Sequence, residues 1–282
     1  MKTRRIEKVV RGSRQVDGAG VSLVRVFGFH DVRDFDPFLM LDAFDSHDPE
    51  DYIKGFPWHP HRGIETVTYL IKGRMDHEDS LGNKGSIGEG ECQWMTAGSG
   101  ILHQEMPIAS ERMLGAQLWV NLPQKDKMTE PQYRDITADM VPVVKDENGV
   151  IRIISGNYLG RAGAIEASYV KVLYLDVEIH PGLSMVIPTL PSENLFVYVV
   201  SGSGTTGESS DAIESHTALL FSKGDQLIFR AGAEGLRMLL LSGESLNEPI
   251  AWGGPVVMNT RQELMEAFDE LDRGTFIKHE PH

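Results

Sequence analysis

The sequence predicts a mainly β protein that folds as two β-barrels and ends in a short α-helix. Three observations lead to this prediction. The 29 glycines and 14 prolines are spread along all 282 residues, short runs with two-residue alternation lie between them, and long helical patterns are nearly absent. Alternation at short intervals, punctuated by glycine turns, is typical of antiparallel sheets that close into barrels or sandwiches.

Three alternating runs are the clearest strand signals. The first covers Val21 to Phe27, and the second places apolar side chains at alternate positions from Leu114 to Leu122. The third covers residues 173–179, where Asp176 and Glu178 are expected to face away from the apolar side. Because successive side chains point to opposite faces of a strand, each run predicts a strand with one face in a core.

The C-terminus is the chief exception to the β pattern. Thr260 and Glu263 form a potential capping box, and Gly274 stands where a helix C-cap would be. One helical face between them carries Leu264, Phe268 and Leu271. We therefore expect a helix near 261–272 that docks its apolar stripe on the barrels.

The least β-like connection is residues 124–149, which carries charges, two prolines and a weak strand signal. A domain boundary near 135 is therefore expected. The domains would be residues 1–135, an N-terminal barrel, and residues 136–282, a C-terminal barrel together with the helix.

Charge, cysteine content and hydropathy exclude several classes of protein. The 27 basic and 41 acidic residues give a net charge of −14, which disfavours direct binding to nucleic acid or to an anionic membrane. Cys92 is the single cysteine, so an internal disulfide and a paired-cysteine zinc site are excluded. We expect a cytoplasmic location, because no 18-residue apolar stretch is present and one cysteine suits a reducing compartment.

The N-terminal residues 1–15 are basic but lack the apolar core of a secretory signal. They are compatible with a nuclear signal, although such basic runs match by chance often. We favour a solvated basic strand and loop.

Histidines recur at strand spacing in the first half of the chain. His59 and His61 are two residues apart, and His103 and Glu105 repeat this spacing. On an extended strand such pairs project from one face. Two pairs on facing strands of a small barrel would offer three nitrogens and one carboxylate oxygen to a single ion.

This donor set suits a catalytic or sensing metal. Imidazole binds Fe, Cu, Ni or Zn, and a carboxylate offsets part of the cation's charge. Four protein ligands to an octahedral ion would leave two positions open, whereas a structural zinc site is closed. The spacing alone leaves open a simpler interpretation, in which the pairs lie on the surface or in a satisfied core.

Residues 56–82 and 93–107 resemble the pirin family of the cupin superfamily, and residues 253–276 are similar to a pirin tail. The resemblance implies two cupin-type barrels, a bicupin, with the metal in the first. It implies that the C-terminal barrel is structural and metal-free, because His180 and His216 stand alone there.

The resemblance also implies a ligand set. The general cupin pattern corresponds here to His59, His61, Glu65, Gly73 and His103. Pirins use the glutamate two residues after the third histidine, so the implied metal ligands are His59, His61, His103 and Glu105, with Glu65 as a supporting or strand residue. The implied cofactor is one mononuclear divalent metal, Fe(II), with Mn, Ni, Cu, Co or Zn as alternatives.

The implied activity is a metal-dependent dioxygenase of the quercetin 2,3-dioxygenase type. Such an enzyme cleaves a flavonol, a small aromatic substrate, with O2 and releases carbon monoxide. Glu105 is the residue expected to take the 3-hydroxyl proton. The alternative is an iron-dependent, redox-sensing regulatory protein that acts through a protein partner.

Other motifs have simpler explanations. Gly202, Gly204 and Gly207 match a dinucleotide-binding pattern, but the following residues 208–216 make a poor helix, so a β-hairpin turn is favoured. His77, Glu78 and Asp79 are expected at a charged hairpin end, with orientation of a metal ligand as the alternative.

Three further side chains are expected in the core. Cys92 is interpreted as a buried small apolar residue in preference to a redox sensor. Trp58 and Trp94 are expected in core packing, with a place at the pocket mouth as the alternative.

Overall fold

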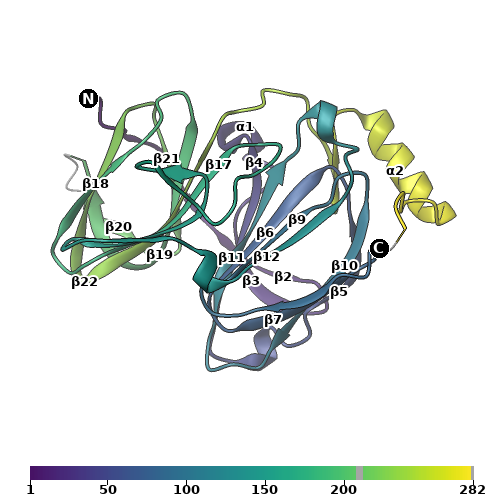
Figure 1. Ribbon diagram of the computed structural model, residues 1–282, viewed down its shortest axis with the longest axis horizontal. Coiled ribbons are helices and arrows are strands. Elements are labelled where there is room, and N and C mark those ends of the chain that lie inside the picture. Colours follow the sequence, from purple (N-terminus) through teal and green to yellow (C-terminus); the bar gives the residue numbers. More distant parts are fainter. Residues whose placement is uncertain (208–211, 281–282) are drawn as a thin grey trace. The chain divides into compact units, whose positions relative to one another are not determined.

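The computed structural model describes residues 1–207 and 212–280 (Figure 1). The chain forms two compact units. The N-terminal barrel unit comprises Ser13–Phe29, Phe38–Ala138 and Leu246–His282. The C-terminal barrel unit comprises Met1–Gly12, His30–Pro37 and Asp139–Ser245.

These units are composed differently from the expected domains 1–135 and 136–282. The chain passes from one unit to the other after Ala138, a few residues from the expected boundary. However, the first residues belong to the C-terminal barrel unit and the last 37, Leu246–His282, to the N-terminal barrel unit. The boundary at 135 also falls inside a strand, Gln132–Ile136, which pairs with Cys92–Thr96.

The N-terminal barrel unit contains two main antiparallel sheets. The larger has the order β12-β9-β6-β11-β4-β3-β2. Its strands are β2 (Ser13–Asp17), β3 (Val21–Phe27), β4 (Phe38–Ser46), β6 (Ile64–Lys72), β9 (Cys92–Thr96), β11 (Met113–Asn121) and β12 (Gln132–Ile136). The smaller has the order β5-β10-β7-β8 and comprises β5 (Phe56–His61), β7 (Arg74–Asp79), β8 (Lys84–Ile87) and β10 (Ile101–Ile108).

The C-terminal barrel unit is built on one antiparallel sheet of order β1-β21-β19-β22-β17-β14-β13, with β18 on β22 and β20 on β19. Its strands are β1 (Ile6–Arg11), β13 (Val143–Lys145), β14 (Gly149–Ser155), β17 (Val172–Ile179), β18 (Ser184–Pro188), β19 (Asn194–Thr206), β20 (Ile213–Glu214), β21 (Thr217–Phe221) and β22 (Gln226–Gly243). The short pair β15 (Asn157–Tyr158) and β16 (Arg161–Ala162) and the helix α1 (Val32–Phe35) complete it.

The predicted mainly β fold with two barrels is confirmed, and the three alternating runs coincide with β3, β11 and β17. Asp176 does lie on the face of β17 opposite the apolar core, but it is fully buried. There its carboxylate accepts hydrogen bonds from Arg237 at 3.0 and 2.7 Å. A buried charge is tolerated when it is paired in this way.

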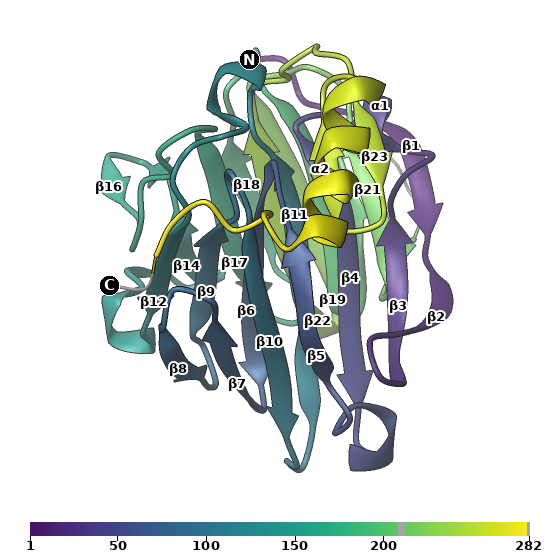
Figure 2. The ribbon, with the colours of Figure 1, turned by 90° about the vertical axis from the view of Figure 1, so that its right-hand side faces the viewer.

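The predicted C-terminal helix is confirmed as α2 (Arg261–Arg273). Thr260 and Glu263 form the capping box, and Gly274 ends the helix at φ +70°. The helix belongs to the N-terminal barrel unit, where it packs on the hairpin of β23 (Ala251–Gly253) and β24 (Val256–Met258) (Figure 2). Its apolar face joins Val256, Met258, Ala267 and Phe276 in one core cluster.

The glycines of the dinucleotide-like pattern lie in the last part of strand β19 and directly after it. Gly202 and Gly204 lie in β19, where a Cβ would come within 2.1 Å of the carbonyl oxygen of Gly235 and within 2.4 Å of that of Arg230. These glycines therefore allow close pairing of β19 with β22. The expected hairpin turn is wrong for Gly202 and Gly204, which lie within the strand, whereas Gly207 lies in a turn directly after β19. Residues 208–211 of the following stretch lie outside the described residues. Within the described residues, no helix has the length and apolar character needed to cross a membrane.

The basic N-terminus is not solvated throughout. Arg4 is fully buried, and its guanidinium donates to the carbonyl oxygens of Ser222, Leu190, Glu193 and Gly224. The expectation of a solvated strand is therefore wrong at this residue. An arginine can be buried when carbonyl acceptors satisfy its fork of donors.

Candidate metal centre

Strands β5 and β10 pair antiparallel and carry the predicted ligands. His103 on β10 lies opposite His59 on β5, and Ile101 lies opposite His61. The register shifts after His103, so that Glu105 lies opposite Phe56. The two-residue spacing therefore places the side chains on one face of each strand, as expected from strand geometry.

Three histidines converge on this face. The ring centroids are 4.3 Å apart for His59 and His103, 4.9 Å for His59 and His61, and 5.0 Å for His61 and His103. One nitrogen from each ring lies within 4.8 Å of the others. Among residues 1–207 and 212–280, this is the one group of three or more His, Cys, Asp or Glu side chains with such spacing. The carboxylate of Glu105 is not part of the group, so its role as fourth ligand stays a prediction.

Backbone carbonyls orient two of the rings. Nδ1 of His59 lies 2.8 Å from the carbonyl oxygen of Pro57, and Nδ1 of His61 lies 3.1 Å from that of Pro255. Since a carbonyl can only accept, both Nδ1 atoms carry a proton, and in the neutral form of each ring the lone pair is on Nε2. This is the usual arrangement of histidines that bind metals.

His103 supplies a further indication that the residues fit a metal. Its side chain is buried, and neither ring nitrogen has a hydrogen-bond partner within the described residues. A buried polar atom without a partner is costly. A metal ion held between His59, His61 and His103 would give one of these two nitrogens a partner.

The buried rings of His61 and His103 are neutral near pH 7. Burial, with a contribution from His59, lowers the pKa of His61 to about 3. Burial also lowers the pKa of His103 well below its usual range, and His61, His59 and His77 contribute. Neutral imidazole is the form that binds metal ions.

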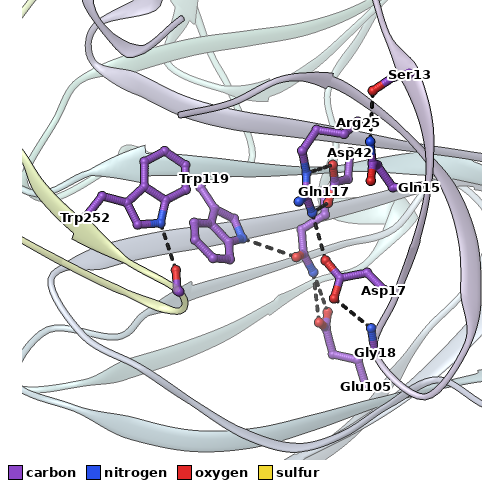
Figure 3. Close-up of polar contacts among 11 residues, drawn as sticks. Ser13, Gln15, Asp17, Gly18, Arg25, Asp42, Glu105, Gln117, Trp119 and Trp252 are labelled. Atoms are coloured by element: carbon purple, nitrogen blue, oxygen red, sulfur yellow. Dashed lines mark hydrogen bonds and ion pairs between the residues drawn. The ribbon is translucent and has the colours of Figure 1, made fainter. Parts of the chain in front are cut away.

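Glu105 follows His103 by two residues on β10 and is 1% exposed. Its Oε1 accepts a hydrogen bond of 3.0 Å from the hydroxyl of Thr68. Nε2 of Gln117 donates to Oε1 at 2.9 Å and to Oε2 at 2.8 Å (Figure 3). These donors are neutral, and a buried carboxylate is normally compensated by a cation or a metal. The three histidines thus fit one transition-metal ion, and the carboxylate of Glu105 would offset part of its charge if it lies within reach.

Aromatic side chains adjoin the histidines. Trp119 packs edge-on against His61 at 4.9 Å, and its Nε1 donates to Oε1 of Gln117 at 3.3 Å (Figure 3). Trp252 lies 5.7 Å from Trp119 with an interplanar angle of 34°, and exposed Phe29 packs edge-on against Trp252 at 5.8 Å. A row of aromatic rings therefore runs from the surface to His61.

His77 departs from the expected charged hairpin end. It lies on β7 opposite Glu105 and is buried, with Nε2 3.3 Å from Oδ1 of Asp135. Burial lowers its pKa, although Asp135 opposes this effect. The hairpin expectation holds for Glu78, which pairs with Lys84, and for Asp79, which accepts from the backbone N–H groups of the turn.

The remaining candidates are distributed as follows. Cys92 is buried, and burial raises the pKa of its thiol, which fits a core residue. Trp94 is buried as expected, but Trp58 is 48% exposed, so its expected place in the core is wrong. Glu65 lies on β6 and accepts a hydrogen bond from Thr96 at 2.7 Å. It is not in the histidine group.

Four residues near the histidines were not expected there from the sequence: Gln117, Trp119, Trp252 and Pro255. Gln117 and Trp119 occupy odd positions of the run 114–122, whose even positions are expected to face a core. The odd positions face Glu105 and His61. The sequence signal for this polar face was the glutamine and the tryptophan that alternate with apolar residues on the strand.

Comparisons with known proteins agree with this geometry. The Pirin family profile matches residues 20–120, and that of the Pirin C-terminal cupin domain matches residues 174–277. The chain belongs to the pirin family. A pirin-like protein of Caulobacter vibrioides is 43% identical over 98% of this chain and 100% of its own length.

Two relatives of this pirin carry an enzyme name. A Pseudomonas aeruginosa protein, named provisionally as a quercetin 2,3-dioxygenase, is 44% identical over 92% of this chain and 93% of its own length. The crystal structure of quercetin 2,3-dioxygenase from Acinetobacter baumannii matches with a TM-score of 0.88 at 32% identity, over 97% of this chain and 98% of that one. The likeness thus covers both barrels.

Proposed function

We propose that this pirin is a metal-dependent dioxygenase that cleaves flavonols such as quercetin with O2. His59, His61, His103 and Glu105 would hold one divalent metal ion, Fe(II). The observation that carries the proposal is the convergence of three histidine nitrogens within 4.8 Å. The buried carboxylate of Glu105 lies on the same strand as His103. The enzyme names of its relatives support the choice of reaction.

The protein's own side chains have distinct tasks in this reaction. A metal held by these residues would supply Lewis acidity to an enolic hydroxyl of the substrate. Glu105 accepts the 3-hydroxyl proton on a carboxylate oxygen, because a base must lie within hydrogen-bond reach of the proton it removes. Gln117 and Thr68 hold that carboxylate in one orientation. Trp119 offers an apolar face for a planar ring and keeps water from His61.

The test is oxygen uptake and carbon monoxide release by the iron-loaded protein with quercetin. Wild-type protein is expected to turn over well above the metal-free form. Glu105→Gln is expected to lose at least about a hundredfold in turnover, the usual contribution of a general base. Iron content is measured in the same samples, and Glu111→Gln, an exposed site, serves as the control.

Two outcomes would oppose the proposal. Full turnover by Glu105→Gln with iron retained would remove the role of Glu105 as the base. No turnover by iron-loaded wild-type protein above the metal-free form would remove the enzyme. If a protein partner then bound in one iron oxidation state only, the regulatory alternative would be favoured.

A further inference from the structure

The C-terminal tail, residues 246–280, contacts the strand end that carries His61. The carbonyl oxygen of Pro255 accepts the Nδ1 proton of His61 at 3.1 Å. Next to it, Arg62 and Val256 form a parallel bridge, and the backbone N–H of Val257 donates to the carbonyl of Arg62 at 3.1 Å. The tail thus supplies the hydrogen-bond acceptor for Nδ1 of His61.

Arg62 fastens the tail from inside the barrel unit. Its buried guanidinium donates to the carbonyl of Ser99 at 2.7 Å, to Oε2 of Glu270 at 2.7 Å and to the carbonyl of Phe276 at 2.9 Å. It also lies 4.1 Å from the ring centroid of Phe276. Two of these partners, Glu270 and Phe276, belong to the tail.

Lys127 makes a second attachment at the same place. Its buried ammonium donates to Oδ1 of Asn121 at 2.6 Å, to the carbonyl of Gly63 at 2.7 Å and to that of Val257 at 2.8 Å. Gly63 has φ +78°, and a Cβ there would stand 2.0 Å from the carbonyl oxygen of Val257. The close approach of the tail therefore requires glycine at this position.

We propose that docking of the C-terminal tail and metal binding are thermodynamically coupled through His61, so that the tail is a working part of the metal centre. The coupling rests on the metal site of the proposed function. A hydrogen bond to the far nitrogen of a ligand histidine sets its tautomer and ring orientation, and losing it costs about 10- to 100-fold in metal affinity. Because coupling is reciprocal, metal binding holds the tail in place by the same factor.

Arg62 and Glu270 act in this scheme as positioning residues. Neither is a proposed ligand, and both hold the segment that presents Pro255 to His61. Loss of the hydrogen bond between Arg62 and Glu270 lets the tail move away from β5. His61 then loses its hydrogen bond to Pro255 and its fixed orientation. A merely structural role would lower stability and leave the affinity of the folded protein for metal unchanged.

The first measurement is Ni(II) affinity of the full-length protein by competition with a chelator. Arg62→Met is expected to weaken binding about tenfold, at the lower end of such effects. Glu270→Gln is expected to weaken it less, because Arg62 keeps its hydrogen bonds to the carbonyls of Ser99 and Phe276. Asp269→Asn, on the exposed side of α2, is the matched control and is expected to bind as wild type does. Glu270 is partly exposed, so its variant keeps the test available if Arg62→Met does not fold.

The second measurement is hydrogen exchange in β23, β24 and α2 with and without Ni(II). Metal is expected to slow exchange there in wild type, and less in Glu270→Gln. The coupling would be overturned if both folded variants bound Ni(II) as tightly as wild type and if Ni(II) did not change the hydrogen-exchange rates of the tail. The metal site itself would then stand. If wild type binds neither Ni(II) nor Fe(II), the metal site and the coupling both fail.

Discussion

Gln117 donates its side-chain amide to both carboxylate oxygens of Glu105, at 2.9 Å to Oε1 and 2.8 Å to Oε2 (Figure 3). The same side chain accepts from Nε1 of Trp119. Because its nitrogen faces the carboxylate and its oxygen faces the indole, the amide has one favourable orientation. Gln117 therefore connects the proposed base to the aromatic ring beside His61.

Replacing Gln117 should lower both the stability of the protein and its turnover of quercetin. Gln117→Leu removes donors from a buried carboxylate, which should lower the free energy of unfolding of the metal-free protein by about 1–3 kcal/mol. Turnover of quercetin by the iron-loaded variant should fall about tenfold, because Glu105 is no longer held in one orientation. Urea denaturation and oxygen uptake measure the two effects. Gln15→Leu, at an exposed position on β2, should change neither.

Stability should depend on pH through Lys127. Burial lowers its pKa from 10.5 to about 7. Between these values the unfolded chain binds the proton and the folded protein does not, so stability rises with pH across this window. The unfolding free energy of wild type relative to Lys127→Met should therefore rise from pH 7 toward pH 10, by at most about 1.4 kcal/mol per pH unit.

Chemical denaturation at a series of pH values gives this difference directly. Taking the difference from Lys127→Met cancels the titration of other groups. Lys125→Met, exposed and two residues away, should show no such slope relative to wild type. A flat difference for Lys127→Met would mean that the folded protein keeps the ammonium charged throughout.

Local strand and helix geometry accounts for what the sequence could predict. His59 and His61 share a face of β5 because residues two apart on a strand point to the same side. The same rule puts His103 and Glu105 on one face of β10. Helix α2 was predictable because its capping box and C-cap glycine act within a few residues. In each case the determining contacts are close in sequence.

The missed features depend on contacts between distant residues. Nothing near Pro255 in the sequence indicates that its carbonyl meets His61, since the two are 194 residues apart. For the same reason, the sequence does not indicate that Met1–Gly12 belongs to the C-terminal barrel unit and Leu246–His282 to the N-terminal barrel unit. On β11 the alternation identified two faces, but it did not show which face lies toward the histidines.

Metal removal should destabilise the protein through His103. A ligand at 100 times its dissociation constant stabilises the folded state by about 2.7 kcal/mol, provided that it does not bind the unfolded chain. Chelation should therefore lower the melting temperature of wild type. His103→Ala should make the melting temperature insensitive to added Ni(II), while His47→Ala, at an exposed position, should respond as wild type does. A chelator-sensitive His103→Ala would place the ion elsewhere.

The contact between Gly63 and the tail can be separated from backbone strain by a matched pair of glycines. Gly63 and Gly160 have φ +78° and +79°, but a Cβ on Gly160 would meet no atom within 4 Å. Gly160→Ala should therefore show only the strain of a left-handed alanine, about 1–2 kcal/mol. Gly63→Ala adds a clash with the carbonyl of Val257, so it should lower the free energy of unfolding further. It should also speed hydrogen exchange in β24, because the tail must move to make room. Equal losses in the two variants would show that the tail can shift at Val257 without cost, and that its close approach to residues 61–63 adds little to stability.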